Sequence, residues 1–156
     1  MKVFVSYSAT DNDFVRKIVK GIRSDAVSVH WWDESKQLGQ NCWEQIFGWI
    51  DDANLVLAII TGKTLERGLA VGNEIGYAKA KGKEIIPLIT DEDDRFDLGC
   101  LIGTVDQYID ENDPQSGIDA IKLHIERKHP ANDEVDWGQV LTVLGLVGVI
   151  WAATRK

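Results

Sequence analysis

A continuous apolar run, Leu55-Val-Leu-Ala-Ile-Ile60, constrains the fold of this chain more than any other feature. Six apolar residues in a row are typical of a strand that is covered on both faces, as in a parallel sheet. Shorter apolar segments lie at Lys2–Ser6, 27–31, Glu84–Ile89 and 105–109. Together these segments predict a sheet of five strands.

Helical patterns separate the predicted strands. Thr10 or Asp11 can cap a first helix, and a last one stops before Pro130. The apolar residues that mark the helices are Phe14, Val15, Ile18, Val19 and Ile22, then Trp43, Ile46, Phe47 and Ile50, and finally Ile118, Ile121, Leu123 and Ile125. Alternating strands and helices predict an α/β fold with a parallel sheet between helical layers. Pro87 is an exception inside its strand, because proline donates no ladder hydrogen bond.

Length and charge limit the classes of protein that fit. The 156 residues suffice for one core-bearing domain, predicted over 1–129, with a polar linker at 130–136. The formal net charge of −8 argues against a nucleic-acid partner, since phosphate binding requires a basic face. Cys42 and Cys100 lack metal or disulfide spacing, which suits a reducing cytosol, and the three scattered histidines predict no metal site. The first residues lead directly into a strand, so we expect no signal peptide.

Glu74 lies among small residues on a predicted helix, in Gly68-Leu-Ala-Val-Gly-Asn-Glu-Ile-Gly76. Small neighbours leave room for a ligand, and a carboxylate there can stabilise a developing cation, such as the oxocarbenium ion of N-glycoside cleavage. The alternative is a solvated helix acid. Gly68, Gly72 and Gly76 share one helical stripe, for which we expect close backbone packing against a neighbour.

Ligands of open parallel sheets bind beyond the carboxyl ends of the strands. Neither a G-x-G-x-x-G motif nor a P-loop is present. The residues that follow the first three strands, together with the helical acid, are therefore the candidate site: Ser6, Tyr7, Ser8, Trp32, Asp33, Thr61, Gly62 and Glu74.

These residues carry a family resemblance. The motifs, in order, are Phe4-Val-Ser-Tyr-Ser8 with Asp11, the Trp32-Asp33 pair, Leu38-Gly39, Trp43, the Leu55–Ile60 strand, and Glu74 before Ile85-Ile-Pro-Leu88. From residue 1 to 128 the chain resembles a TIR (Toll/interleukin-1 receptor) domain. The resemblance implies a flavodoxin-like, three-layer fold with a five-stranded parallel sheet. It also implies that 32–41 corresponds to the BB loop, and it accounts for Pro87.

Many prokaryotic TIR domains similar to this one cleave NAD+ at the nicotinamide–ribose bond, in antiviral defence or signalling. The resemblance implies that Glu74 is the catalytic glutamate and that NAD+ is a substrate, with no cofactor required. The product is ADP-ribose or a cyclic isomer, and activity depends on self-assembly into a homo-oligomer. The residues implied in binding the dinucleotide are Tyr7, Ser8, Trp32, Asp33, Leu38, Gly39, Trp43 and Thr61.

One position departs from the pattern. Several catalytic relatives carry tryptophan four residues before the glutamate, where this chain has Ala70. The change implies an altered product or a degenerate site, unless Trp32 or Trp43 provides the stacking surface. Two rival functions stay open: a nucleoside deoxyribosyltransferase-like N-glycosidase, and a non-enzymatic adaptor that acts through TIR–TIR contacts.

The last segment, 137–154, contains no charged residue. Its length is just sufficient for a transmembrane helix, and Trp137 and Trp151 are placed as interfacial anchors. We expect an apolar helix that anchors a cytoplasmic domain to the inner membrane. The alternative is a helix that packs on the domain or inside an assembly.

Overall fold

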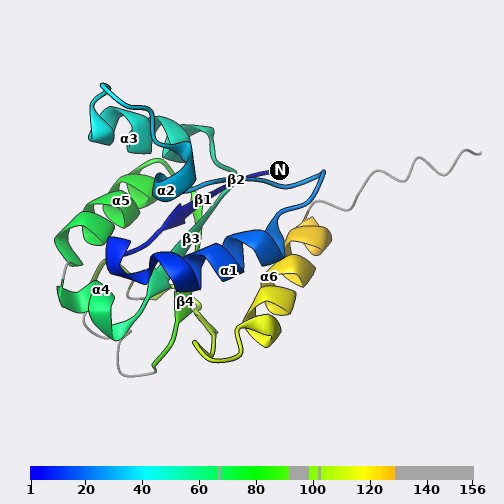
Figure 1. Cartoon of the computed structure of the whole chain (residues 1–156). Helices are drawn as coiled ribbons and strands as arrows, with labels where there is room; N and C mark the ends of the chain where they lie inside the picture. Colours follow the sequence, from blue (N-terminus) through cyan, green and yellow to red (C-terminus); the bar gives the residue numbers. More distant parts are fainter. Residues whose placement is uncertain (67, 92–98, 102, 129–156) are drawn as a thin grey trace, which may run out of the picture.

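The computed structural model describes residues 1–66, 68–91, 99–101 and 103–128 (Figure 1). The strands are β1 (Lys2–Ser6), β2 (Ser28–His30), β3 (Leu55–Ile60), β4 (Glu84–Ile89) and β5 (Gln107–Tyr108). The α-helices are α1 (Asn12–Ile22), α2 (Trp32–Ser35), α3 (Cys42–Asp52), α4 (Gly62–Glu66), α5 (Gly68–Ala80) and α6 (Gln115–Lys128). Two short 3-10 helices, η1 (Ala9–Asp11) and η3 (Gly99–Leu101), complete the described elements.

The sheet is parallel throughout, in the order β2-β1-β3-β4-β5. The prediction of an α/β fold with a five-stranded parallel sheet is therefore confirmed. The central strands have the predicted bounds, whereas the edge strands β2 and β5 are shorter than predicted. Edge strands are paired on one side only, so fewer of their residues are held in a ladder.

Helices cover both faces of the sheet, as Figure 1 shows. Residues along a strand point alternately to opposite faces, so Val3 and Val5 pack with α1 and α6, whereas Phe4 packs with α3 and α5. The continuous apolar run of β3 is divided in the same way, and all six of its residues are buried. This two-sided burial is the reason that β3 does not alternate in sequence.

The segment 32–41, after β2, was predicted to be a loop. Its first residues, Trp32–Ser35, instead form a helical turn, so the prediction was wrong there. The indole Nε1 of Trp31 donates to Glu34 Oε2 at 2.7 Å, and the backbone N–H of Ser35 donates to the carbonyl of Trp31 at 3.0 Å. Arg23 from the end of α1 also donates to Glu34, at 2.6 Å. These bonds close one helical turn, α2, and fix the position of Trp32 at its start.

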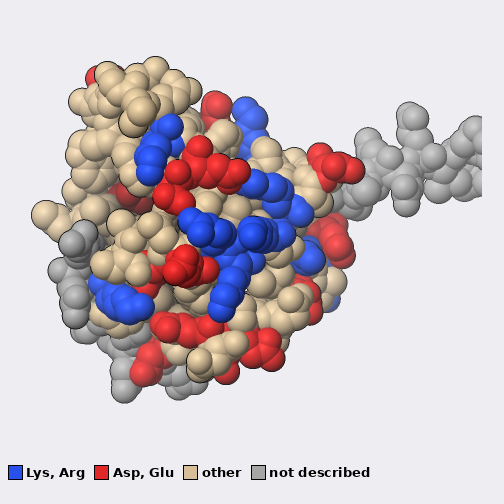
Figure 2. Space-filling view, viewed as in Figure 1, with Lys and Arg blue, Asp and Glu red and all other residues tan. Residues whose placement is uncertain are grey.

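Ion pairs join α1 to α2 on the outer face of the molecule. Figure 2 shows Lys and Arg side chains gathered over α1 and bordered by Asp and Glu. Arg16 pairs with Asp33 at 2.9 Å, and Arg23 pairs with Glu34 at 2.6 Å. Exposed pairs of this kind each contribute little to stability, so these contacts add only modestly to the packing of α2 on α1.

Pro87 disrupts no hydrogen bond of the ladder. Ile109 N–H donates to the carbonyl of Ile89, so Ile89 and, two residues earlier, Pro87 direct their backbone toward the β5 side. On that side β4 pairs with β5 only at Leu88 and Ile89. The nitrogen of Pro87 therefore lies before the point at which β5 begins.

The expectation of close packing along the glycine stripe of α5 was wrong at the two positions described. A Cβ atom added at Gly72 or Gly76 would meet nothing within 4 Å. The tightly packed glycines are instead Gly21 and Gly117, where an added Cβ atom would lie 2.7 Å from Ile118 and from Ile109, respectively. Backbone approach is therefore close where α1 and β5 meet α6.

Within the described residues, no helix combines the length and the apolar character that crossing a membrane requires. The predicted apolar helix over 137–154, and the linker over 130–136, lie outside the described residues. The division into a domain over 1–129, a linker and an apolar helix therefore stays a prediction.

Candidate functional site

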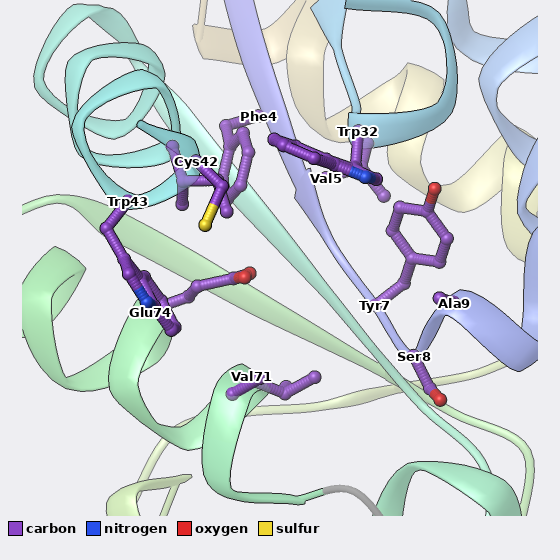
Figure 3. A pocket seen from close by; sticks show the side chains of 12 residues that line it. Phe4, Val5, Tyr7, Ser8, Ala9, Trp32, Cys42, Trp43, Val71 and Glu74 are labelled. Carbon is purple, nitrogen blue, oxygen red and sulfur yellow. The ribbon is translucent and has the colours of Figure 1, made fainter. Parts of the chain in front are cut away.

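A cavity of about 250 Å³ opens at the carboxyl end of β1. Its walls come from β1, η1, α2, α3 and α5, which surround it as Figure 3 shows. The lining residues are Phe4, Val5, Tyr7, Ser8, Ala9, Trp32, Cys42, Trp43, Ile46, Ala70, Val71 and Glu74. This is the edge of the sheet at which ligands of open parallel sheets bind.

Glu74 reaches from α5 into this cavity, with its carboxylate directed toward β1 (Figure 3). The residue is only 8 % exposed, so the alternative of a solvated helix acid is wrong. The Oγ of Ser6 donates a hydrogen bond to Glu74 Oε2 at 2.5 Å. Burial raises the pKa of Glu74 from 4.5 to about 7, although the bond from Ser6 acts in the opposite direction. The carboxylate is thus held in place and titrates close to neutral pH.

The cavity brings together five of the residues predicted for the site: Tyr7, Ser8, Trp32, Trp43 and Glu74. Tyr7 accepts a hydrogen bond from the backbone N–H of Asp33 at 3.3 Å, which connects β1 to α2. Burial is the main cause that raises the pKa of Tyr7 to about 12, so its phenol stays protonated. Ser8 is buried, and its Oγ lies 2.8 Å from Thr10 Oγ1.

Trp43 stands at the mouth of the cavity and is 36 % exposed. Its indole packs in a row with two other rings. The ring centroids of Trp43 and Phe47 lie 5.6 Å apart, and Phe47 stacks on Tyr77 at a centroid distance of 4.2 Å. Tyr77 is fixed in turn by a 3.0 Å hydrogen bond to Asp51. Ala70 lines the same cavity from α5 with a single methyl group.

The other predicted residues do not line the cavity. Asp33 forms ion pairs with Arg16 and Lys36 on the outer face. Thr61 is buried, and its Oγ1 donates to the carboxylate of Asp11 at 2.8 Å. That bond joins the segment after β1 to the end of β3. Within the described fold, Thr61 therefore stabilises the structure beside the cavity.

Leu38 and Gly39 lie in the exposed segment between α2 and α3. Leu38 is 93 % exposed, and Gly39 has a φ of 82°, a conformation that side-chain-bearing residues rarely adopt. An apolar side chain that the fold leaves in solvent is available for contact with another molecule.

Seven of the lining residues were absent from the predicted catalytic and binding set: Phe4, Val5, Ala9, Cys42, Ile46, Ala70 and Val71. Cys42 is the first residue of α3 and faces the cavity, and Val71 lies one turn before Glu74 (Figure 3). Ser6 was part of the candidate site at the end of the first strand, but its bond to Glu74, which joins residues 68 positions apart, was not predicted. The one available signal was a polar residue at the end of an apolar strand.

The arrangement favours positive charge. The described residues that line the cavity include four aromatic rings and one carboxylate, and none of them is Lys, Arg or His. Among the described residues, no group of three His, Cys, Asp or Glu side chains could hold a metal ion. A carboxylate in such surroundings can stabilise a cation that develops beside it.

Comparison with known proteins gives the family. The family model described as "TIR domain" matches residues 3–124, so this chain belongs to the TIR domain family. The resemblance inferred from the motifs, and the fold that it implied, are confirmed. No curated protein matches the chain.

Solved structures that share the fold include two from different classes of protein. One is a CMP N-glycosidase, BcmB, from Clostridium botulinum, at 18% identity and a TM-score of 0.58, with 80% of this chain and 99% of that chain covered. The other is the TIR domains of the activated Roq1 resistosome bound to the effector XopQ, at 14% identity and a TM-score of 0.53, with 90% and 76% covered. At these identities, the likeness concerns the fold alone.

Proposed function

We propose that this TIR domain is an N-glycosidase that cleaves NAD+ between nicotinamide and ribose, with Glu74 as its catalytic residue. The observation that carries the proposal is the buried carboxylate of Glu74, bonded to Ser6 and directed into a cavity at the carboxyl end of β1. Membership of the TIR family and the shared fold of a CMP N-glycosidase support a reaction at a glycosidic bond.

In the proposed reaction the C–N bond breaks and its electron pair stays with nicotinamide. The pyridinium ring thereby leaves as a neutral molecule, so no general acid is required. Positive charge develops on the ribose, where the carboxylate of Glu74 stabilises it. Water then gives ADP-ribose and a proton, whereas adenine or a ribose hydroxyl gives a cyclic product. Cofactors have no part in this scheme.

The size of the cavity supports a binding mode in which only one end of the dinucleotide is enclosed. A volume of about 250 Å³ lies below the roughly 300–1,000 Å³ typical of ligand sites, so the cavity accommodates the nicotinamide riboside end. The phosphates and adenosine would then extend past Ala9, an exposed residue that lines the cavity. The exposed Leu38 and Gly39 of a second copy would complete this outer part, which makes activity dependent on a homo-oligomer.

Cavity size also favours one rival substrate class. A nucleoside monophosphate places its base and ribose in the same space, and the fold is similar to that of a CMP N-glycosidase. The further rival, a non-enzymatic adaptor, predicts binding between TIR domains and no turnover. The proposed setting is the cytosol, in antiviral defence or signalling, and membrane attachment through 137–154 is part of the same proposal.

Substitution of Glu74 tests the function. The full-length protein at high concentration is incubated with NAD+ and, separately, with CMP, and products are separated by mass and retention. We expect nicotinamide release from NAD+ and its loss in Glu74→Gln by a factor of about 10²–10³, because one electrostatic stabiliser is removed. Cleavage of CMP alone would establish the rival class, and equal activity of Glu74→Gln would refute the role of the carboxylate.

A further inference from the structure

We propose that Ser6 is a positioning residue: its hydroxyl holds one oxygen of the Glu74 carboxylate and thereby presents the other oxygen to the ligand in the cavity. This inference rests on the proposed function and deepens it, because it assigns a second residue to the same reaction. Ser6 acts through Glu74 and does not itself contact the ligand.

The fold brings the two side chains together from different elements. Side chains along β1 point alternately to opposite faces of the sheet, and Phe4 packs on the face that α3 and α5 cover. Ser6, two residues later, therefore faces the same way, toward Glu74 on α5. Phe4 and Ala58, the register partner of Ser6 on β3, belong to the apolar cluster on this face and have no side-chain donor. The hydroxyl of Ser6 is thus a polar group in an otherwise apolar part of the sheet.

The bond between the two residues is short and buried. Ser6 Oγ lies 2.5 Å from Glu74 Oε2, within the range of hydrogen bonds from a hydroxyl to a carboxylate. Ser6 is fully buried, so water does not compete for its hydroxyl. Rotation about the last side-chain bond of a glutamate is only weakly restricted. A bond to one oxygen therefore fixes the orientation of the carboxylate.

The second oxygen of Glu74 stays available to a ligand. Within the described part of the chain, no hydrogen bond reaches Glu74 Oε1, and the side chain of Glu74 lines the cavity (Figure 3). Ser6 is not one of the lining residues. Oε2 is thus held from the sheet, and Oε1 is the oxygen that meets the reacting ribose in the proposed reaction.

The same bond opposes the effect of burial on Glu74. Burial raises the pKa of Glu74 to about 7, and the bond from Ser6 acts against this rise. The other titratable side chains among the described lining residues are Tyr7 and Cys42. Burial is also the main cause that raises the pKa of Tyr7 to about 12, so Tyr7 stays neutral while Glu74 titrates. Removal of the Ser6 hydroxyl should therefore move the titration of Glu74 to higher pH.

The titration of Glu74 can be followed without turnover. The full-length protein is labelled with 13C in its glutamate carboxyl groups, and the resonance that disappears in Glu74→Gln is assigned to Glu74. In Ser6→Ala we expect the titration midpoint to rise by about 1–2 pH units, because a hydrogen bond to a charged group is lost.

Two further variants control this measurement. Ser6→Cys keeps the size of the side chain and offers a weaker donor, so it should give a smaller rise, and it carries the test if Ser6→Ala does not fold. Thr64→Val removes another fully buried hydroxyl, which does not line the cavity and bonds no carboxylate. This variant should leave the midpoint of Glu74 unchanged.

Rates with NAD+ measure the effect on the reaction. On the high-pH plateau, where Glu74 is ionised, Ser6→Ala should lower kcat about tenfold and leave KM within about twofold, because a misdirected carboxylate stabilises the transition state less. Adding Ser6→Ala to Glu74→Gln should cause no further loss, because no carboxylate is then left to position. A serine needed only for packing would lower kcat by the same factor in both backgrounds.

An unchanged midpoint in Ser6→Ala, an equal rise in Thr64→Val, or an equal loss of kcat in both backgrounds would overturn the inference. Because the titration needs no substrate, the two proposals fail separately. A midpoint that rises in Ser6→Ala, in a protein that does not cleave NAD+, contradicts the proposed function alone. Cleavage that requires Glu74 but leaves the midpoint and kcat unchanged in Ser6→Ala contradicts the positioning role alone.

Discussion

Burial of Glu74 has opposite consequences for folding and for chemistry. The fold removes the carboxyl group from water, which raises its pKa from 4.5 to about 7 and makes its ionised form unfavourable in the empty cavity. The proposed reaction requires that same ionised form. A positively charged ligand would relieve the conflict, because its charge favours the carboxylate.

Stability should therefore depend on pH through Glu74. Its pKa is higher in the folded than in the unfolded chain, so its contribution to stability is complete below about pH 4.5 and is lost as pH rises through about 7. Glu74→Gln removes this effect, and at about pH 8 we expect the variant to be more stable than the wild type by up to about 3 kcal/mol. Urea unfolding at pH values near 5 and 8 checks this. If the variant and the wild type differ in stability by the same amount at both pH values, burial is not the cause of the raised pKa of Glu74.

Activity should change with pH in the other direction. We expect kcat/KM for NAD+ to rise as pH increases through about 7, because that parameter follows ionisation of the free enzyme. The rise in kcat should have its midpoint at a lower pH than the rise in kcat/KM, because a bound pyridinium ring favours the ionised form of Glu74. Initial rates across the range from about pH 5 to 9 give both profiles, and coincident midpoints would exclude this effect of the ligand's charge.

At the scale of single elements, the glycines of two helices should respond in opposite ways. A Cβ atom at Gly117 would lie 2.7 Å from Ile109, which is fully buried and has no room to move. We expect Gly117→Ala to destabilise the domain by about 1–3 kcal/mol, the usual cost of overpacking. Gly76→Ala adds a methyl group in open space on a helix and should stabilise it by about 0.5–1 kcal/mol. Thermal unfolding of both variants makes the comparison, and destabilisation by Gly76→Ala would restore the packing role first expected for this stripe.

At the scale of the whole molecule, two exposed apolar residues allow the assembly proposal to be tested. Specific activity should rise with protein concentration over about a hundredfold range, as mass action requires of an associating enzyme. Leu38→Asp should lower activity at every concentration without lowering stability, because Leu38 is 93 % exposed. Val105→Asp is the matched control, since Val105 is 86 % exposed and does not line the cavity. Constant specific activity, with both variants fully active, would indicate a self-contained monomeric site.

The described part of the domain already contains two clusters of buried apolar residues. Among the residues that the structure describes, these clusters include side chains as far along the chain as Ile125, and a chain that ends at His129 keeps all of them. A chain shortened after His129 should therefore unfold in one cooperative transition and cleave NAD+ when concentrated. Calorimetry and the product assay check this, and a shortened chain that fails to fold would assign the tail to the core.

The sequence alone determined the elements and their arrangement in layers. The apolar run of β3, the spacing of apolar residues in α1 and α6, and the motifs around β1 all depend on local patterns, which periodicity and burial impose directly. Glu74 was identified for the same reason, because small neighbours on a helix are visible in the sequence. Local patterns failed at α2, where bonds among Trp31, Glu34 and Arg23 close a helical turn in a polar segment.

Only the tertiary structure decided which residues share the cavity. Ser6 bonds Glu74 across 68 positions of sequence, and Thr61 bonds Asp11 across 50. No local pattern could therefore show that Glu74 lines the cavity whereas Thr61 does not. Trp43 and Ala70 come together through the packing of α3 on α5, and the raised pKa of Glu74 results from burial that several elements provide together. Contacts of this kind depend on distances in space, which residue order does not contain, and they give the candidate site its chemistry.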